Sequence, residues 1–241
     1  MRHTIVAQEM ETTRIAELLA PFMAEPEVSQ TLLEHLQRYL DLLLRWNARM
    51  NLTAVRDPEQ IVTRHFGESL FAARVLLYEP KVAQAFRPAS NRPNNGEGLQ
   101  SLRDAVRTLA DVGSGAGFPG IPMKLLAPEL ELTLIESQSK KATFLREVIR
   151  ALGLDRAQVF SGRAGQWGKT ADFVTLRAVE QFSRVLPVAA ELVATGGKLC
   201  LLIGAGQIHE AQQLVGADWR WQEPKAMPQS TGRVVLVGSC R

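Results

Sequence analysis

The chain is poor in cysteine, aromatic residues and histidine. Its 241 residues include only two cysteines, Cys200 and Cys240, which excludes a disulfide framework and a four-cysteine zinc site. The four histidines show no ligand spacing with one another or with the cysteines, so we expect no metal site. Aromatic residues make up 6% of the chain, too few to indicate nucleic-acid binding mainly by stacking on rings.

Long apolar runs and a strong net charge are also missing. Every apolar stretch falls short of the ~18 residues that span a membrane, and acidic residues occur near the N-terminus, where a signal peptide needs an apolar run. We therefore expect a cytoplasmic protein with no membrane partner, and a monomer. Lys and Arg number 28 against 25 Asp and Glu, a basic excess that permits a nucleic-acid partner without demonstrating one.

The first third of the chain has a helical pattern. Apolar residues over 30–46 recur at helical spacing, with Ser29 placed as an N-cap. A second helix is expected to begin after Asp57 and Pro58 and to run to about Leu77. Residues 79–103 contain prolines, asparagines and few large apolar side chains, which predicts a loop. We expect a helical N-terminal domain over 1–78, a flexible linker loop over 79–107 and a main domain over 108–241.

Strand and helix patterns alternate from residue 108 onward. Strands are expected over 106–113, 130–137, 158–162, 171–178, 198–204 and 233–239. Helices are expected between them, among them one over 185–195 that Gly196 and Gly197 would end. This alternation predicts an α/β fold of the Rossmann-like type, an open and mostly parallel sheet with helices on both faces.

The most informative segment lies between the first expected strand and its helix. Gly113, Gly115 and Gly117 follow each other at every second position, and glycine lets a backbone take positive φ and approach a ligand closely. Glu136 ends the next expected strand, where a carboxylate can accept hydrogen bonds from both ribose hydroxyls of a nucleoside. The pattern predicts a nucleoside cofactor at this edge of the sheet.

Two cofactors compete for this loop. Gly115, Gly117 and Gly120 also fit the G-x-G-x-x-G pattern of dinucleotide sites. However, Pro119 lies inside that match, where a pyrophosphate needs free backbone N–H groups. Asp111 precedes the first glycine by two residues, and its carboxylate can orient the loop and face a positively charged cofactor. We therefore expect S-adenosylmethionine, with NAD as the alternative.

The chain resembles the bacterial small-subunit (16S) ribosomal RNA guanine-N7 methyltransferase family, also called RsmG or glucose-inhibited division protein B. Motifs that carry this resemblance include RWNARMNLTAVRDP (45–58), RHFGESL (64–70), DVGSGAGFPGIP (111–122), LIESQSKKATFLREV (134–148) and LRAV (176–179). The resemblance implies a methyltransferase domain behind a small helical domain. It implies methyl transfer from S-adenosylmethionine, with S-adenosylhomocysteine as product, to small-subunit ribosomal RNA or an assembling small subunit.

The resemblance also implies roles for single residues. Gly113 and Phe118 stand where the family contacts S-adenosylmethionine, and Ala164 and Gly165 stand beside the adenine. Arg177 matches the arginine at the mouth shared by cofactor and substrate, and is our candidate catalytic residue. The family's R-x-E turn lacks its carboxylate here, at Gly165, and its H-x-x-D-S motif has Glu68, one methylene longer, in place of the aspartate. A ribosome-binding or assembly module with weak or lost catalysis is therefore the alternative function.

Chemistry and charge add two expectations. Guanine N7 carries a free lone pair, so its methylation needs alignment rather than a general base. We therefore expect His65 to be structural, bonded to Glu68 or at the junction of the two domains. Lys140 and Lys141 begin a helix on the ligand side of the sheet, and we expect them to contact RNA phosphates, which would make binding sensitive to salt.

Overall fold

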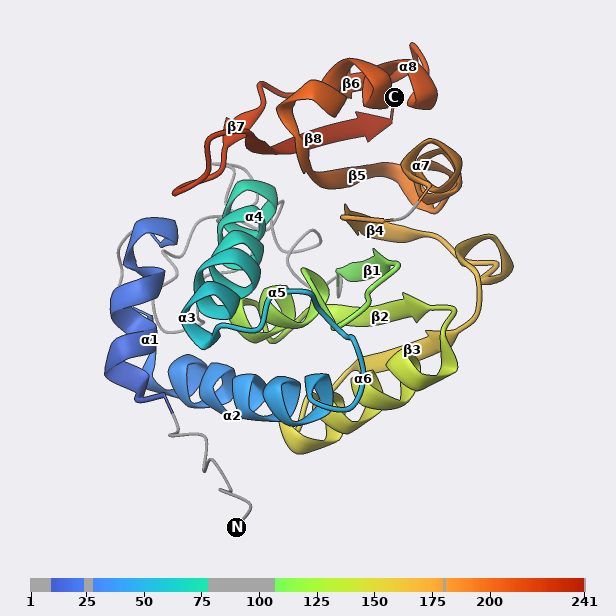
Figure 1. Ribbon diagram of the computed structural model, residues 1–241. Coiled ribbons are helices and arrows are strands. Elements are labelled where there is room, and N and C mark those ends of the chain that lie inside the picture. The colour runs from blue at the N-terminus through green and yellow to red at the C-terminus, as the bar shows by residue number, and fades with distance from the viewer. Residues whose placement is uncertain (1–9, 24–27, 78–106, 180, 241) are drawn as a thin grey trace, which may run out of the picture.

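The computed structural model describes residues 10–23, 28–77, 107–179 and 181–240 (Figure 1). The expected linker over 79–107 lies outside these ranges except for Arg107, so the linker and the domain boundaries that it defines stay predictions. Among the described residues, none of the helices has the length and apolar character that crossing a membrane requires.

A single mixed sheet forms the centre of the molecule, with strand order β3-β2-β1-β4-β5-β8-β6. Strands β1 to β5 pair in parallel, whereas β8 pairs antiparallel with β5, β6 and β7. The predicted open α/β sheet is confirmed. Its strands are β1 (Thr108–Val112), β2 (Glu131–Glu136), β3 (Ala157–Ser161), β4 (Ala171–Arg177), β5 (Val193–Gly204), β6 (Trp219–Trp221), β7 (Lys225–Ala226) and β8 (Arg233–Cys240).

Helices cover both faces of the sheet, as expected. Helices α1 to α6 share one hydrophobic cluster with Leu132, Leu134 and other residues of one sheet face, and α7 and α8 pack on the opposite face (Figure 1). The helices are α1 (Thr12–Leu19), α2 (Gln30–Asn47), α3 (Pro58–Ile61), α4 (Glu68–Leu77), α5 (Gly120–Leu126), α6 (Ser139–Ala151), α7 (Phe182–Glu191) and α8 (Ile208–Val215), with 3-10 turns η1 (Ala20–Phe22), η4 (Ala164–Gln166) and η5 (Ala205–Gln207). The N-terminal helices therefore have a core in common with the sheet.

The predicted helix starts are confirmed. Ser29 Oγ accepts a hydrogen bond from the Leu32 amide at 3.2 Å, and Asp57 Oδ1 accepts one from the Gln60 amide at 2.8 Å. The helix after Asp57 differs from the expected regular form, because a π-helical segment, η2 (Val62–Gly67), joins α3 to α4. Such segments often occur at functional sites.

The expected end of the helix before β5 is wrong. Helix α7 ends at Glu191, and the chain enters β5 at Val193, which pairs with Ala171. Gly196 has φ +74°, and a Cβ on Gly197 would lie 2.7 Å from a backbone oxygen of β4. These glycines therefore form an irregularity inside the strand rather than a helix cap. The short strands β6 and β7 were also not expected.

Asn47 explains part of the sequence motif that follows α2. Its side chain, 5% exposed, closes the turn to residue 53. Oδ1 accepts hydrogen bonds from the amides of Leu52 at 2.9 Å and Thr53 at 3.1 Å, and Nδ2 donates to the Thr53 carbonyl at 3.1 Å. The asparagine thus fixes the segment that carries Thr53.

We expect Asn47→Ala to lower the free energy of unfolding by about 1–3 kcal/mol, because two backbone amides lose a shared acceptor in a mostly buried place. Asn47→Asp keeps the acceptor for the two amides but places a buried carboxylate oxygen against the Thr53 carbonyl, so it should also lower the free energy of unfolding. Urea unfolding of the three proteins measures both effects. Equal stability of Asn47→Ala and the wild type would contradict this account of the turn.

Candidate active site

The glycine loop lies at the topological switch point of the sheet. Strand β1 has β2 on one side and β4 on the other, and the loop follows its carboxyl end, which is where open α/β sheets bind ligands. Gly113, Gly115 and Gly117 all have positive φ, at 68°, 56° and 93°. The amides of Gly113 and Ser114 donate to the Ile135 carbonyl of β2 at 2.9 and 3.1 Å. The loop is therefore held against the neighbouring strand in a shape that glycine permits.

Asp111 holds the elements on either side of the glycine loop in place. The residue is fully buried; Oδ1 accepts a hydrogen bond from Thr175 Oγ1 at 2.8 Å, and Oδ2 accepts one from the Gly120 amide at 3.2 Å. Burial raises the pKa of this carboxyl to about 6, against the opposing effect of these donors. Asp111 thus ties β1 to β4 and to the start of α5. Its expected role in orienting the loop agrees with these bonds, while contact with a cofactor stays a prediction.

Glu136 lies beside the glycine loop at the end of β2. One carboxylate oxygen accepts a hydrogen bond from the Gly115 amide at 2.9 Å, and the other accepts one from the Gln138 amide at 2.7 Å. A carboxylate has about four lone-pair sites, so this group is fixed in place and can still accept two further hydrogen bonds. That is the capacity that two ribose hydroxyls require.

The turn after β3 completes this side of the site. The Gly162 amide donates to the Glu136 carbonyl at 3.1 Å, which places η4, with Ala164 and Gly165, next to the end of β2. Gly165 is exposed, and a Cβ there would meet only Val188 Cγ1, at an ordinary 3.6 Å. Packing does not force glycine at this position.

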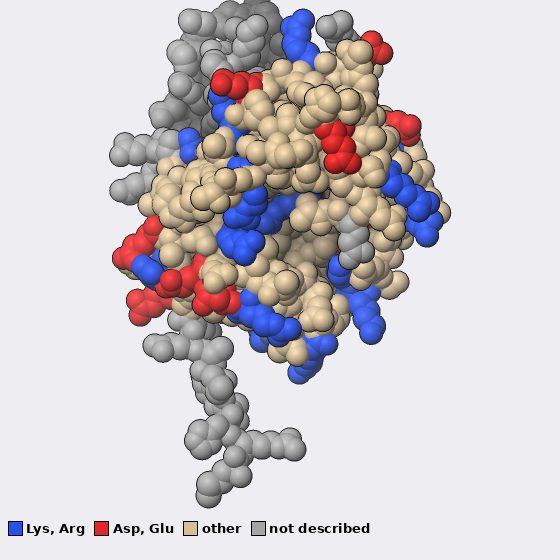
Figure 2. Space-filling model, turned by 45° about the horizontal axis from the view of Figure 1, so that its top comes forward, with Lys and Arg blue, Asp and Glu red and all other residues tan. Residues whose placement is uncertain are grey.

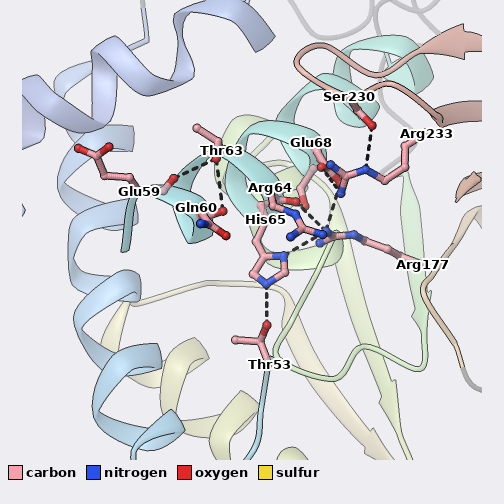
Figure 3. Close-up of polar contacts among 11 residues, drawn as sticks. Thr53, Glu59, Gln60, Thr63, Arg64, His65, Glu68, Arg177, Ser230 and Arg233 are labelled. Atoms are coloured by element: carbon pink, nitrogen blue, oxygen red, sulfur yellow. Dashed lines mark hydrogen bonds and ion pairs between the residues drawn. The ribbon is translucent and has the colours of Figure 1, made fainter. Parts of the chain in front are cut away.

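Arg177 ends β4 and belongs to a buried polar cluster (Figure 3). Its Nη2 donates to the Arg64 carbonyl at 2.6 Å, His65 Nδ1 at 3.0 Å and Glu68 Oε2 at 3.2 Å. Glu68 Oε1 lies 2.6 Å from Nη1 of Arg233, the first residue of β8. One carboxylate on α4 therefore bridges two arginines from different strands, and burial raises its pKa.

His65 is held in one neutral form. Because an arginine can only donate, Nδ1 must accept from Arg177, and Nε2 then donates to Thr53 Oγ1 at 2.8 Å. Burial and the neighbouring Arg177 and Arg64 lower the pKa of His65 to about 3. The predicted structural role agrees with these contacts, which join the helices to the sheet rather than bonding His65 to Glu68.

A cavity of about 360 Å³ opens at this cluster. Apolar residues from the ends of β4 and β5 and the start of β8 contribute to its lining. The polar lining residues are Thr53, Arg64, His65, Glu68, Arg177, Gln207 and Arg233. The lining contains three arginines and one carboxylate, so its net charge is positive. Figure 2 shows Lys and Arg side chains gathered around a hollow on one face of the molecule. The volume falls in the range of small-molecule sites.

Phe118 links the two halves of the site. Its ring stacks on His65 with centroids 4.8 Å apart, and Arg177 Cζ lies 5.9 Å from its centroid. The structure therefore brings the glycine loop, Glu136, the η4 turn and Arg177 to one edge of the sheet. Lys140 and Lys141 lie in the first turn of α6, which follows β2 at the same edge. Among the described residues, no group of three or more His, Cys, Asp or Glu side chains is arranged to hold a metal ion.

Several residues of the site were not expected from the sequence. Thr53 and Arg233 carry no local signal, and Glu68 was expected only as a possible hydrogen-bond partner of His65 and as a departure from a family motif. Tyr39 lies in the apolar stripe over 30–46 and was not expected to reach the glycine loop, where its hydroxyl donates to the Ala116 carbonyl. Each of these residues acquires its role from a contact that is distant in sequence, which periodicity cannot reveal.

Comparison of the sequence with known proteins assigns the chain to a family. The model of the family described as "rRNA small subunit methyltransferase G" matches residues 32–83 and 97–231. A "Ribosomal RNA small subunit methyltransferase G" of Xanthomonas campestris pv. campestris is 37% identical over 206 residues, covering 84% of each chain. That of Stenotrophomonas maltophilia is 35% identical over 227 residues, covering 92% of this chain and 93% of the relative. The chain belongs to the rRNA small subunit methyltransferase G family.

Proposed function

We propose that this chain transfers a methyl group from S-adenosylmethionine to N7 of a guanine in small-subunit (16S) ribosomal RNA. One observation carries the proposal: a glycine loop with a fixed carboxylate and a positive cavity lie side by side at the carboxyl edge of one sheet, joined by Phe118. Membership of the family and the names of the relatives support the RNA substrate.

The cofactor half of the site suits a nucleoside better than a dinucleotide. Glu136 is held by two backbone amides and keeps acceptor capacity for a ribose. A pyrophosphate would need free N–H groups at the start of α5, but the Gly120 amide already donates to Asp111. S-adenosylmethionine, when bound, supplies a methyl group on a positively charged sulfur. We propose that Gly113, Gly115, Phe118, Ala164 and Gly165 contact it.

The acceptor half of the site suits a nucleotide. The cavity is large enough for one purine, which has to leave its stack to enter it. Arg177 and Arg233 can contact phosphate or the guanine O6, and bound phosphate would neutralise charge that otherwise opposes the cationic product. We propose that Arg177 orients the base in this way, because its carbon Cζ lies next to Phe118 and hence next to the cofactor half.

The chemistry needs orientation and no proton acceptor. Guanine N7 attacks with its own lone pair, so holding N7 in line with the methyl group can account for ~7–11 kcal/mol of the barrier reduction. His65 has no lone pair to offer as a base, because its Nδ1 accepts from Arg177 and its Nε2 donates to Thr53. His65 therefore acts through the position of Arg177.

We propose that Lys140 and Lys141 hold phosphates of the RNA outside the cavity. Both stand in the first turn of α6, at the edge of the sheet where the cofactor is proposed to bind. A helix N-terminus favours anions, which adds to the charge of the two lysines.

The competing function, a ribosome-binding module with weak catalysis, has one observation in its favour: the missing carboxylate at Gly165.

We expect the protein to introduce 7-methylguanosine into small-subunit ribosomal RNA when it is incubated with labelled S-adenosylmethionine. Nucleoside mass spectrometry of the digested RNA identifies the product. Gly113→Arg should abolish transfer, because residue 113 has φ +68° and even a Cβ there would lie 2.9 Å from Val179. Binding to small subunits without any transfer would favour the module and contradict the proposal.

Glu136→Gln should weaken S-adenosylhomocysteine binding about tenfold or more, because hydrogen bonds to a charged acceptor contribute about 1.5–3 kcal/mol. Isothermal titration calorimetry measures the dissociation constant. Glu131→Gln is the matched control, since Glu131 is exposed at the opposite end of the same strand. Binding of NADH instead of S-adenosylhomocysteine by the wild type would overturn the assignment of the cofactor.

His65 should make the protein sensitive to acid. Its pKa is about 3 in the folded chain and about 6.5 when unfolded, so the unfolded state binds the proton more readily and stability falls as pH drops below 6.5. Between roughly pH 8 and pH 5, the free energy of unfolding of the wild type should fall by about 2 kcal/mol more than that of His65→Gln. Urea unfolding at both values measures this difference, and parallel losses in the two proteins would refute it.

A further inference from the structure

Tyr39 connects the N-terminal helices to the glycine loop. It is fully buried on α2, and its hydroxyl donates to the carbonyl of Ala116, between Gly115 and Gly117. The other buried side chains of the α2 stripe that face the core are mainly leucines. Phenylalanine would fill almost the same space, and a buried hydroxyl is tolerated there only because it has a partner. The hydroxyl at this position therefore indicates a role in holding the glycine loop.

The loop is shaped around this hydroxyl. Gly117 has φ +93°, and a Cβ there would lie 2.5 Å from the Tyr39 hydroxyl oxygen and 2.5 Å from Ile121 Cδ1. The amides of Gly117 and Phe118 both turn back to the Ser114 carbonyl, at 2.6 and 3.2 Å. Without the hydroxyl, the Ala116 carbonyl would lack its donor in a buried place. Rotation of that peptide would move the loop where the cofactor is proposed to lie.

The ring of Tyr39 also supports the residue between the two halves of the site. It stacks on Phe118 with centroids 5.4 Å apart, and Phe118 stacks in turn on His65 at 4.8 Å. Phe66 contacts both Tyr39, at 5.3 Å, and Phe118, at 5.7 Å. Phe118 is thus clamped between a residue of α2 and a residue that fixes Arg177.

We infer that Tyr39 is a positioning residue for methyl transfer, one that sets the Ala116 carbonyl and the Phe118 ring and so aligns the cofactor loop with the acceptor cavity. The inference rests on the proposed function. Burial holds the pKa of Tyr39 well above its usual value, so the hydroxyl stays a donor at any working pH. The residue acts through the loop and touches no reacting atom.

The test is Tyr39→Phe, which removes one oxygen and keeps the ring. We expect about tenfold weaker S-adenosylhomocysteine binding and a kcat lowered about tenfold or more, with KM for the RNA within about twofold of the wild type. If the role of Tyr39 were purely structural, Tyr39→Phe would lower the midpoint of unfolding, and a lower kcat with an unchanged KM would not be seen. The matched control is Trp46→Phe, because Trp46 also contacts the sheet domain from α2, at Phe144 and 5.6 Å between centroids.

The outcomes distinguish failure of this inference from failure of the proposed function. If the wild type binds S-adenosylhomocysteine and Tyr39→Phe binds and turns over equally well, the inference is wrong and the function stands. If the wild type binds none, the proposed function fails. If Tyr39→Phe does not fold, Phe66→Leu loosens the same ring contacts while keeping the hydroxyl. Its kcat should fall with KM for the RNA unchanged, and an unchanged kcat would overturn the inference.

Discussion

The buried carboxylate of Asp111 is the contact on which the site depends. It lies in the sheet at the point where the chain order reverses, and it accepts hydrogen bonds from β4 through Thr175 and from the start of α5 through Gly120. A buried charge is costly unless such donors surround it. Asp111 therefore fixes the strand, the neighbouring strand and the helix around the glycine loop together, and the loop takes its shape between them.

The second half of the site depends on contacts between the helices and the sheet. Glu68 on α4 bridges Arg177 and Arg233, whose strands β4 and β8 are not neighbours in the sheet. Removal of one member of such a buried cluster leaves the others without compensation. The helical part is thus more than a cover, because Glu68 on α4 holds two arginines of the cavity in place.

Much of the fold was predictable because it follows from local patterns. The strand–helix alternation, the caps at Ser29 and Asp57 and the position of the glycine loop all follow from spacing and residue type within short segments. The wrong helix end shows the limit of such patterns, because Gly196 and Gly197 are typical of a helix cap but serve an irregular strand. Only the pairing of that strand with β4 decides between the two, and pairing is a tertiary property.

The two departures from the family pattern differ in what the structure says about them. At Gly165 nothing crowds a Cβ, so the missing carboxylate is not enforced by packing, and the fixed Glu136 retains acceptor capacity beside it. At Glu68 the longer side chain is in use, because its two oxygens reach two arginines at 3.2 and 2.6 Å. The missing carboxylate at Gly165 therefore leaves Glu136 available for the proposed ribose contact, whereas both oxygens of Glu68 are in use. The retained Glu136 and the contacts of Glu68 favour an active enzyme over a module that has lost catalysis.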